Sequence, residues 1–185
     1  MSETPSKLKR ARRLWRYTGK GRPEFAVMPG PGQESVWDYP RPPRIEPDAR
    51  RVQVSCAGVT LADTTRCLRV LETASPPTFY LPMEDVRMEY LHPCTGSSLC
   101  EWKGCARYWS VYLRDSFIAE RAAWSYPVPY DDSKSIAGYV SFYPAKVDCC
   151  VAGVRVTAQP GGFYGGWVTP EIVGPFKGLP GTQHW

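Results

Sequence analysis

The chain has 185 residues, of which 43% are hydrophobic and 22% charged; this is enough for one well-buried core and too little for two full-size domains. No apolar run is long enough to cross a membrane and no apolar signal stretch opens the sequence, so we expect a soluble, cytoplasmic protein. The odd number of cysteines, 7, fits free thiols in a reducing compartment. The many glycines, prolines and aromatic residues favour short strands and turns over a helical bundle.

The net charge of +5 is concentrated at the N-terminus, because residues 1–22 carry eight basic side chains and one acidic side chain. Residues 1–33 show no core pattern. Ser6 to Tyr17 could form a short basic helix, and the glycines and prolines that follow end any continuation. We predict that residues 1–33 form a basic, flexible N-terminal arm. In the alternative, residues 7–22 contact nucleic-acid phosphates or an acidic partner.

Residues 34–157 have the pattern of a β-rich core domain. Arg51 to Cys56 alternates between apolar and polar residues, and the alternation resumes after Ala57-Gly58, which predicts a hairpin with a tight glycine turn. Next, Asp63 can cap a helix that runs from about Thr64 to Glu72, with three apolar side chains at helical spacing.

Short strands are predicted along the rest of this domain. They cover Thr78 to Leu81, Val86 to Tyr90, Leu99 to Lys103, Ala106 to Leu113, Ala122 to Tyr126, Gly138 to Tyr143, Val147 to Val151 and Val154 to Val156. The last two strands are joined at Ala152-Gly153 and form a second predicted hairpin. This spacing predicts a mainly β, single compact domain of curved antiparallel sheets, a sandwich or an open barrel, with one short helix.

Residues 158–185 form a tail rich in glycine and aromatic residues. An unordered tail would expose Phe163, Tyr164, Trp167 and Phe176 to water. We therefore expect the tail to pack on the core or on a partner subunit, and in the second case to build a homo-oligomer.

The cysteines do not form a recognisable metal site. Cys94, Cys100 and Cys105 have the spacing C-x5-C-x4-C, Cys149 and Cys150 are adjacent, and no CxxC pair occurs. Structural zinc usually needs four closely spaced ligands. The sequence therefore predicts no metal and no cofactor.

Several ordered blocks of the sequence carry a family signature. They are Glu34 to Pro43, Cys100 to Gly104, Ala123 to Pro127, Val140 to Pro144 and the glycine-aromatic tail. Together, over roughly residues 30 to 185, they resemble the family called domain of unknown function 427 (DUF427), sometimes labelled nucleotidyltransferase-like. The resemblance implies a compact β fold similar to the β-tent group and implies no known reaction. The phosphate-binding loops and paired carboxylates of nucleotidyl transfer do not occur in this sequence.

Cys100 with Lys103 is the best candidate for catalytic chemistry. The family's usual form of this block is Cys-Pro-aromatic-Lys-Gly, and Glu101 stands here in place of the proline. Positions three apart on a strand point to opposite faces, so the two side chains share a pocket only if a bulge or turn intervenes, which Gly104 could provide. A close ammonium would favour a reactive thiolate. The alternative is a small buried thiol with a lysine at the sheet edge.

A second set of candidates also lies at family-motif positions. It comprises Glu72, Tyr80, Asp85, Tyr108, Trp124 and Tyr126. The set predicts an aromatic-lined ligand pocket in which carboxylates orient a ligand or transfer a proton, with Glu72 as a third catalytic candidate. In the alternative, the two carboxylates end local elements and the aromatic residues fill the core.

Three classes of function follow from these observations. The first is a small-molecule-binding domain or enzyme with a pocket around Cys100 and Lys103. The second is an interaction module that uses the C-terminal tail, and the third is a nucleic-acid accessory protein that uses the basic arm. We rank them in that order.

Overall fold

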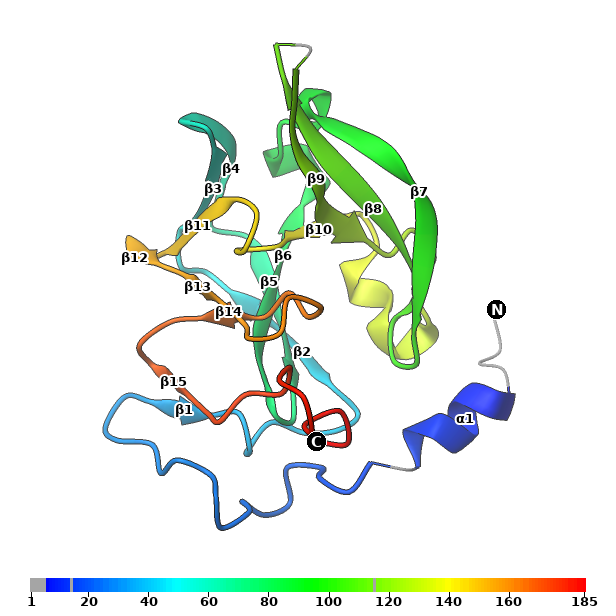
Figure 1. Ribbon diagram of the computed structural model, residues 1–185, viewed down its shortest axis with the longest axis vertical. Coiled ribbons are helices and arrows are strands. Elements are labelled where there is room, and N and C mark those ends of the chain that lie inside the picture. Colours follow the sequence, from blue (N-terminus) through cyan, green and yellow to red (C-terminus); the bar gives the residue numbers. More distant parts are fainter. Residues whose placement is uncertain (1–5, 14, 115) are drawn as a thin grey trace.

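The computed structural model describes residues 6–13, 15–114 and 116–185. Its largest unit is a seven-stranded sheet in which all neighbouring strands are antiparallel. In spatial order its strands are β2 (Arg44–Asp48), β5 (Cys67–Glu72), β6 (Ser75–Pro82), β10 (Tyr139–Phe142), β9 (Ser116–Ser125), β8 (Gly104–Leu113) and β7 (Leu91–Cys100). Figure 1 shows β7, β8 and β9 as long, curved strands that lie together at one side of the molecule. The mainly β, antiparallel architecture predicted from the sequence is confirmed.

A second, four-stranded sheet contains both predicted hairpins. Its order is β12 (Val154–Arg155), β11 (Asp148–Val151), β3 (Val52–Cys56) and β4 (Val59–Thr64). Ala57 and Gly58 have φ values of 47° and 77°, and Ala152 and Gly153 have 50° and 79°. Two consecutive residues with positive φ form the tight turn that matches the twist of antiparallel strands. Both hairpins are therefore confirmed.

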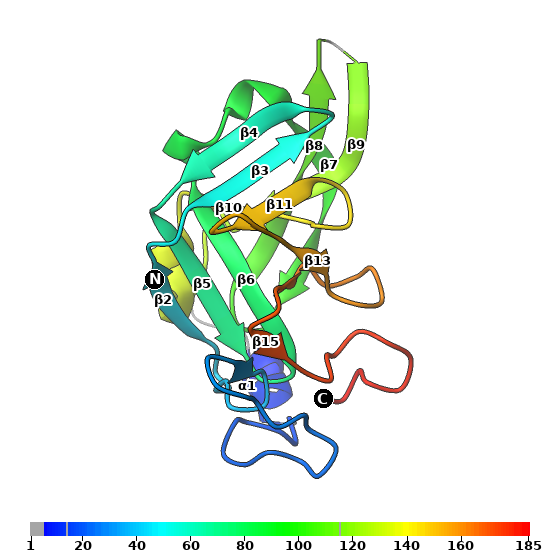
Figure 2. The same cartoon turned by 90° about the vertical axis from the view of Figure 1, so that its left-hand side faces the viewer.

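The main core lies between the two sheets. Figure 2 shows the four-stranded sheet lying across one face of the seven-stranded sheet. Val54 and Leu61 face Phe79 and Phe142 across this interface, and all four side chains are almost completely buried. Burying apolar side chains on both inner faces supplies most of the stabilisation of such a domain.

The predicted helix from about Thr64 to Glu72 is wrong, because this segment ends β4 and forms β5. The strand β5 is paired on both edges, with β2 and β6. Its apolar side chains enter separate clusters, since Cys67 belongs to the main core while Val70 and Leu71 pack into two others. A strand buried on both faces loses the alternation that identifies strands, so its apolar residues matched helical spacing by chance.

The predicted strand from Val86 to Tyr90 is also wrong. The short 3₁₀ helix η1 (Met83–Asp85) precedes this stretch, and a second one, η2 (Met88–Tyr90), occupies its end. Only Val86 makes a strand-like bridge, with Ala62. The remaining helices are α1 (Ser6–Arg12) and the 3₁₀ helix η3 (Asp131–Ile136). In the part of the chain that the structure describes, no helix combines the length and apolar character needed to cross a bilayer.

The C-terminal tail packs on its own domain. It adds three short strands, β13 (Thr157–Ala158), β14 (Trp167–Val168) and β15 (Ile172–Val173). The buried indole of Trp167 packs 5.1 Å from the Phe79 ring and donates a hydrogen bond of 3.0 Å to the Phe142 carbonyl. The strand β15 pairs in parallel with β1 (Glu34–Ser35), so the tail also contacts the first strand of the core domain. A role of the tail in an oligomer stays a prediction.

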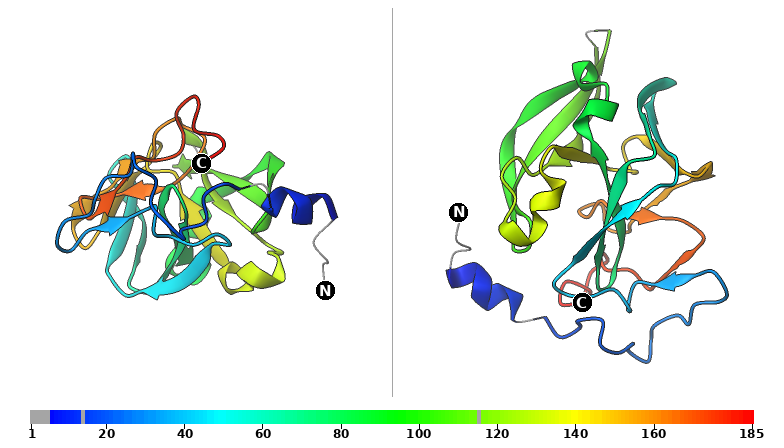
Figure 3. Two further views of the ribbon diagram at one scale, coloured as in Figure 1. Left: turned by 90° about the horizontal axis from the view of Figure 1, so that it is seen from below. Right: turned by 180° about the vertical axis from the view of Figure 1, so that it is seen from behind.

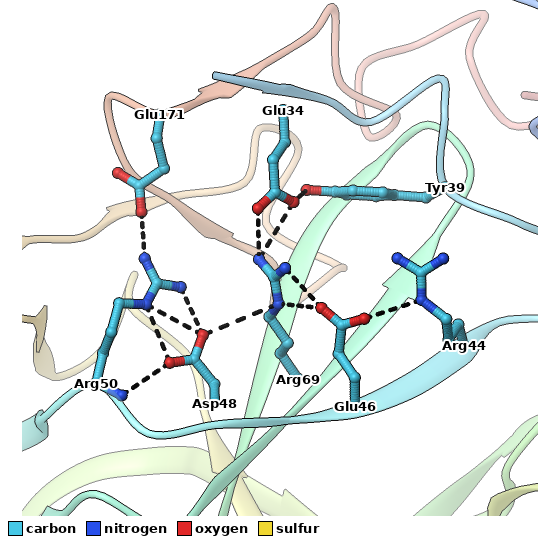
Figure 4. Close-up of polar contacts among 8 residues, drawn as sticks. All are labelled: Glu34, Tyr39, Arg44, Glu46, Asp48, Arg50, Arg69 and Glu171. Atoms are coloured by element: carbon cyan, nitrogen blue, oxygen red, sulfur yellow. Dashed lines mark hydrogen bonds and ion pairs between the residues drawn. The ribbon is translucent and has the colours of Figure 1, made fainter. Parts of the chain in front are cut away.

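A network of ion pairs connects this tail and β1 to the large sheet (Figure 4). Arg69 of β5 binds Glu34 of β1 at 2.9 Å and Glu46 of β2 at 2.6 Å. Arg50 binds Asp48 of β2 and also Glu171 of the tail. Segments far apart in sequence are thus joined by guanidinium groups, which can contact several carboxylates at once.

Candidate functional site

Two hairpin tips place the catalytic candidates at one end of the molecule. Cys100 ends β7 and pairs with Gly104 at the start of β8, so the residues between them form the turn. This turn brings Lys103 back toward Cys100. It is the intervening turn that the two side chains need in order to share a pocket. Gly104 has a φ of 103°, and an added Cβ would meet the Val128 carbonyl oxygen at 3.3 Å, so the position favours glycine. Figure 1 shows the β5–β6 tip, where Glu72 lies, pointing the same way.

The structure brings seven of the eight predicted site residues to one cavity of about 240 Å³. They are Glu72, Tyr80, Cys100, Lys103, Tyr108, Trp124 and Tyr126. Five of these residues lie on five strands of the seven-stranded sheet, Lys103 lies in the turn between β7 and β8, and Tyr126 directly follows β9. Such convergence of polar and aromatic groups is the usual character of a small-molecule site.

The ammonium group of Lys103 is the dominant charge of the cavity. Its side chain is only 13% exposed, and the nearest carboxylate oxygen, Oε2 of Glu72, lies 4.0 Å from Nζ. Burial disfavours the charged form, but the acidic groups of Cys100, Tyr80 and Glu72 around it outweigh burial and hold the pKa of Lys103 above its ordinary value. Among the described residues, this Nζ donates no hydrogen bond within the usual distance. Lys103 is therefore a fixed cation with unused donors.

Glu72 lies between two cations. Its Oε1 accepts a hydrogen bond of 3.2 Å from Nε of Arg41, and its Oε2 faces Lys103. The Arg41 side chain is almost completely buried and also donates to the carbonyl oxygens of Tyr17 and Thr73, at 3.0 and 2.8 Å. The carboxylate of Glu72 is thus oriented by Arg41 on one side and available to the cavity on the other.

Aromatic side chains form the inner wall. The hydroxyl of Tyr80, which is completely buried, accepts a hydrogen bond of 3.2 Å from Nε1 of Trp124. Burial raises the pKa of Tyr80 to about 12 and also raises the pKa of Tyr126. Tyr108 shares a hydrogen bond of 2.6 Å with Ser98. Uncharged phenols and an indole therefore present flat, weakly polar surfaces to a ligand.

Asp85 is the one predicted site residue that does not line this cavity. It lies at the end of η1, where it accepts hydrogen bonds from Thr64 and from both Nε and Nη2 of Arg66. The Arg66 guanidinium holds the pKa of Asp85 below its ordinary value. Its contacts favour the structural alternative, in which the carboxylate closes a local turn.

Comparison with known protein families gives one match. Residues 44–153 match the family model described as a domain of unknown function, DUF427. The chain belongs to the DUF427 family. No curated protein matches the chain. The DUF427 match spans Glu72, Cys100 and Lys103, and the description of the family adds no reaction to them.

Segments outside the DUF427 match complete the cavity, and sequence reasoning missed their contribution. From the N-terminal arm comes Trp15, and from the tail come Gln159, Phe163, Tyr164, Gly165 and Lys177. Lys177 is buried, and its backbone N–H donates 2.7 Å to the Ala74 carbonyl beside the β5–β6 tip. The glycine-aromatic composition indicated that the tail packs closely on something, but nothing in the sequence indicated this cavity.

The DUF427 chain shows no metal site in the residues that the structure describes, since no group of three or more His, Cys, Asp or Glu side chains could hold an ion there. Three of the cysteines, Cys56, Cys67 and Cys149, are buried, and burial raises the pKa of each thiol. Cys100 is half-buried and lines the cavity, whereas Cys105 is exposed on β8.

Proposed function

We propose that the cavity binds a small molecule that carries an anionic group, and that this group pairs with Lys103. The observation that carries the proposal is the largely buried ammonium whose closest carboxylate oxygen is 4.0 Å away. An ammonium has three donors, and one that is largely buried in a cavity gains from charge-assisted hydrogen bonds to acceptors held inside that cavity. A carboxylate or phosphate oxygen of a ligand supplies the missing acceptors.

The size and walls of the cavity restrict the rest of the ligand. A cavity volume of about 240 Å³ fits a small molecule and is below the usual range for drug-sized ligands, which starts at roughly 300 Å³. Tyr80, Trp124 and Tyr126 offer ring faces and edges to an apolar or planar part. Small organic acids and small phosphate esters match both requirements.

Cys100 is the group that would react if the domain is an enzyme. A thiolate formed there would be held near the Lys103 ammonium, which is the arrangement that activates thiol nucleophiles. Glu72, oriented by Arg41, would then take up or return a proton. Binding is the first claim, and catalysis is a second step that depends on it.

A panel of small anions tests the binding claim. The unfolding temperature of the protein is measured with acetate, benzoate and inorganic phosphate, and hits are titrated calorimetrically. We expect at least one anion to raise the unfolding temperature with its concentration, since a ligand that binds only the folded state stabilises it. Lys103→Met should abolish this shift, whereas Lys134→Met, at an exposed position of η3, should preserve it. An equal shift in the Lys103→Met protein, or no shift with any anion, would refute the proposal.

The two alternatives from the sequence, an oligomer through the tail and nucleic-acid binding through residues 7–22, stay predictions. No contact among the described residues favours either of them over the cavity. Sedimentation of a chain lacking residues 159–185 and the salt dependence of DNA binding would test them.

A further inference from the structure

We infer that Trp15 is the side chain that sets the upper size of the ligand, and that the segment of residues 6–13, 15 and 16 acts as a strap which has to lift before a larger molecule can enter. This inference rests on the proposed function, because it concerns access to the same cavity. It assigns the N-terminal arm a role at the site in place of nucleic-acid binding.

Trp15 is held at the edge of the cavity by contacts on three sides. Its Nε1 donates a hydrogen bond of 3.1 Å to Oε1 of Glu101, in the turn that carries Lys103. Its ring lies 4.1 Å from Cζ of Arg41 and 3.9 Å from Nζ of Lys177. Cations at this distance from an indole are attracted to its face. The indole therefore connects the arm, the core and the tail.

Arg12 fixes the preceding helix to the same hairpin tip. Its Nε donates 2.6 Å to the Glu101 carbonyl, and its Nη1 lies 3.1 Å from Oδ2 of Asp132 in η3. The guanidinium also lies 4.9 Å from the centre of the Trp102 ring. Figures 1 and 3 show α1 beside the β7–β8 tip and η3, and apart from the rest of the sheet.

Tyr17 anchors the end of the strap, because its carbonyl oxygen accepts a hydrogen bond from Arg41 and its ring packs against Trp37. Before Tyr17 the strap has few other attachments, so that part can open without unfolding the domain. A helix of seven residues is too short to be stable alone. In the described part of the chain before β1 (Glu34–Ser35), no residue belongs to a β-strand, so no sheet holds the backbone of the strap. Elements held by a few side-chain contacts open at a much lower free energy than the core does. Phe163 and Tyr164 of the tail also line the cavity, but the tail is paired through β14 and β15, so Trp15 lies on the less firmly attached segment.

Alkylation of Cys100 by a small and a bulky reagent measures this access. Iodoacetamide and a fluorescein-bearing maleimide are compared, and the rate at Cys100 is divided by the rate at the exposed Cys105 of the same molecule, using peptide mass spectrometry. Trp15→Ala removes the indole, and Arg13→Ala changes an exposed side chain of the same segment as a control. Circular dichroism verifies that each variant is folded.

We expect Trp15→Ala to accelerate the bulky reagent at Cys100 by about tenfold, with a smaller effect on iodoacetamide and none from Arg13→Ala. If the bulky reagent modifies Cys100 equally fast in both proteins, Trp15 does not limit access, and the inference is overturned while the binding proposal stands. If Cys100 resists iodoacetamide even in the Trp15→Ala protein while Cys105 reacts, the cavity admits no small molecule. That result overturns the proposed function, and the inference with it.

Discussion

The backbone of Gly165 lies directly on the indole of Trp124, and a Cβ atom added to this glycine would be 2.2 Å from Cη2 of the ring. The indole cannot retreat freely, because its Nε1 is hydrogen-bonded to the buried hydroxyl of Tyr80. The tail therefore closes the cavity through a contact that requires the absence of a side chain.

Gly165→Ala should loosen the tail and open the cavity. Forcing a methyl group into a packed contact costs about 1–3 kcal/mol. We expect a lower unfolding temperature and weaker anion binding, measured by thermal denaturation and calorimetry. Gly21→Ala is the matched control, since a Cβ there meets nothing within 4 Å. Unchanged stability in the Gly165→Ala protein would show that the tail adjusts around the methyl group.

Arg69→Met should destabilise the protein far more than the loss of a surface ion pair. Arg69 is 14% exposed and binds Glu34 and Glu46; without it, Glu34 loses its cation and Glu46 retains only the exposed Arg44. We expect a loss of roughly 2 kcal/mol in the free energy of unfolding, below the range for fully buried pairs because both carboxylates are partly exposed.

Arg155→Met provides the comparison for this substitution. Its partner is Asp148, and the two side chains are 79% and 52% exposed, so we expect a change of less than about 1 kcal/mol. Urea denaturation of both variants measures the difference. Equal losses would mean that the network in Figure 4 stabilises the fold no more than an exposed pair does.

The buried thiol of Cys67 should make the protein less stable at alkaline pH. Burial raises its pKa to about 12 from an ordinary value of 9.0. Between these values the unfolded chain releases the thiol proton and the folded chain retains it, so rising pH favours unfolding and stability falls. In urea denaturation at pH 8 and pH 10 under reducing conditions, Cys67→Ala should reduce this fall, whereas Cys105→Ala at the exposed position should not. The same fall in the Cys67→Ala protein would contradict the assignment.

Local sequence signals predicted the parts of the fold that local geometry determines. The two hairpins with Ala-Gly turns formed as expected, because two residues with positive φ specify the connection without reference to the rest of the chain. The helix expected after Asp63 failed for the opposite reason. Its side chains are buried against residues that are distant in sequence, such as Trp167, Ile172 and Trp124, and a local pattern contains no information about them.

The candidate site likewise contains residues that the sequence indicated and residues that it did not. The sequence indicated Cys100, Lys103 and Glu72, which lie on adjacent hairpin tips within the region that matches DUF427. It did not indicate Trp15 or Lys177, because docking across the whole length of the chain places them at the cavity. Asp85 is a carboxylate at a family-motif position, as Glu72 is, but it lies at the end of a short helix on another part of the surface.

The parallel pairing of β1 with β15 has a consequence for the order in which the molecule assembles. Trp37 donates a hydrogen bond to the Pro175 carbonyl across 138 residues of chain, so the first strand has no partner until the tail has been synthesised. Hairpins such as β3–β4 close short loops and can form early, whereas contacts of high sequence separation form slowly. We therefore expect a nascent chain to hold a folded sheet with Cys100 uncovered, and to acquire a closed site only once the tail has emerged from the ribosome.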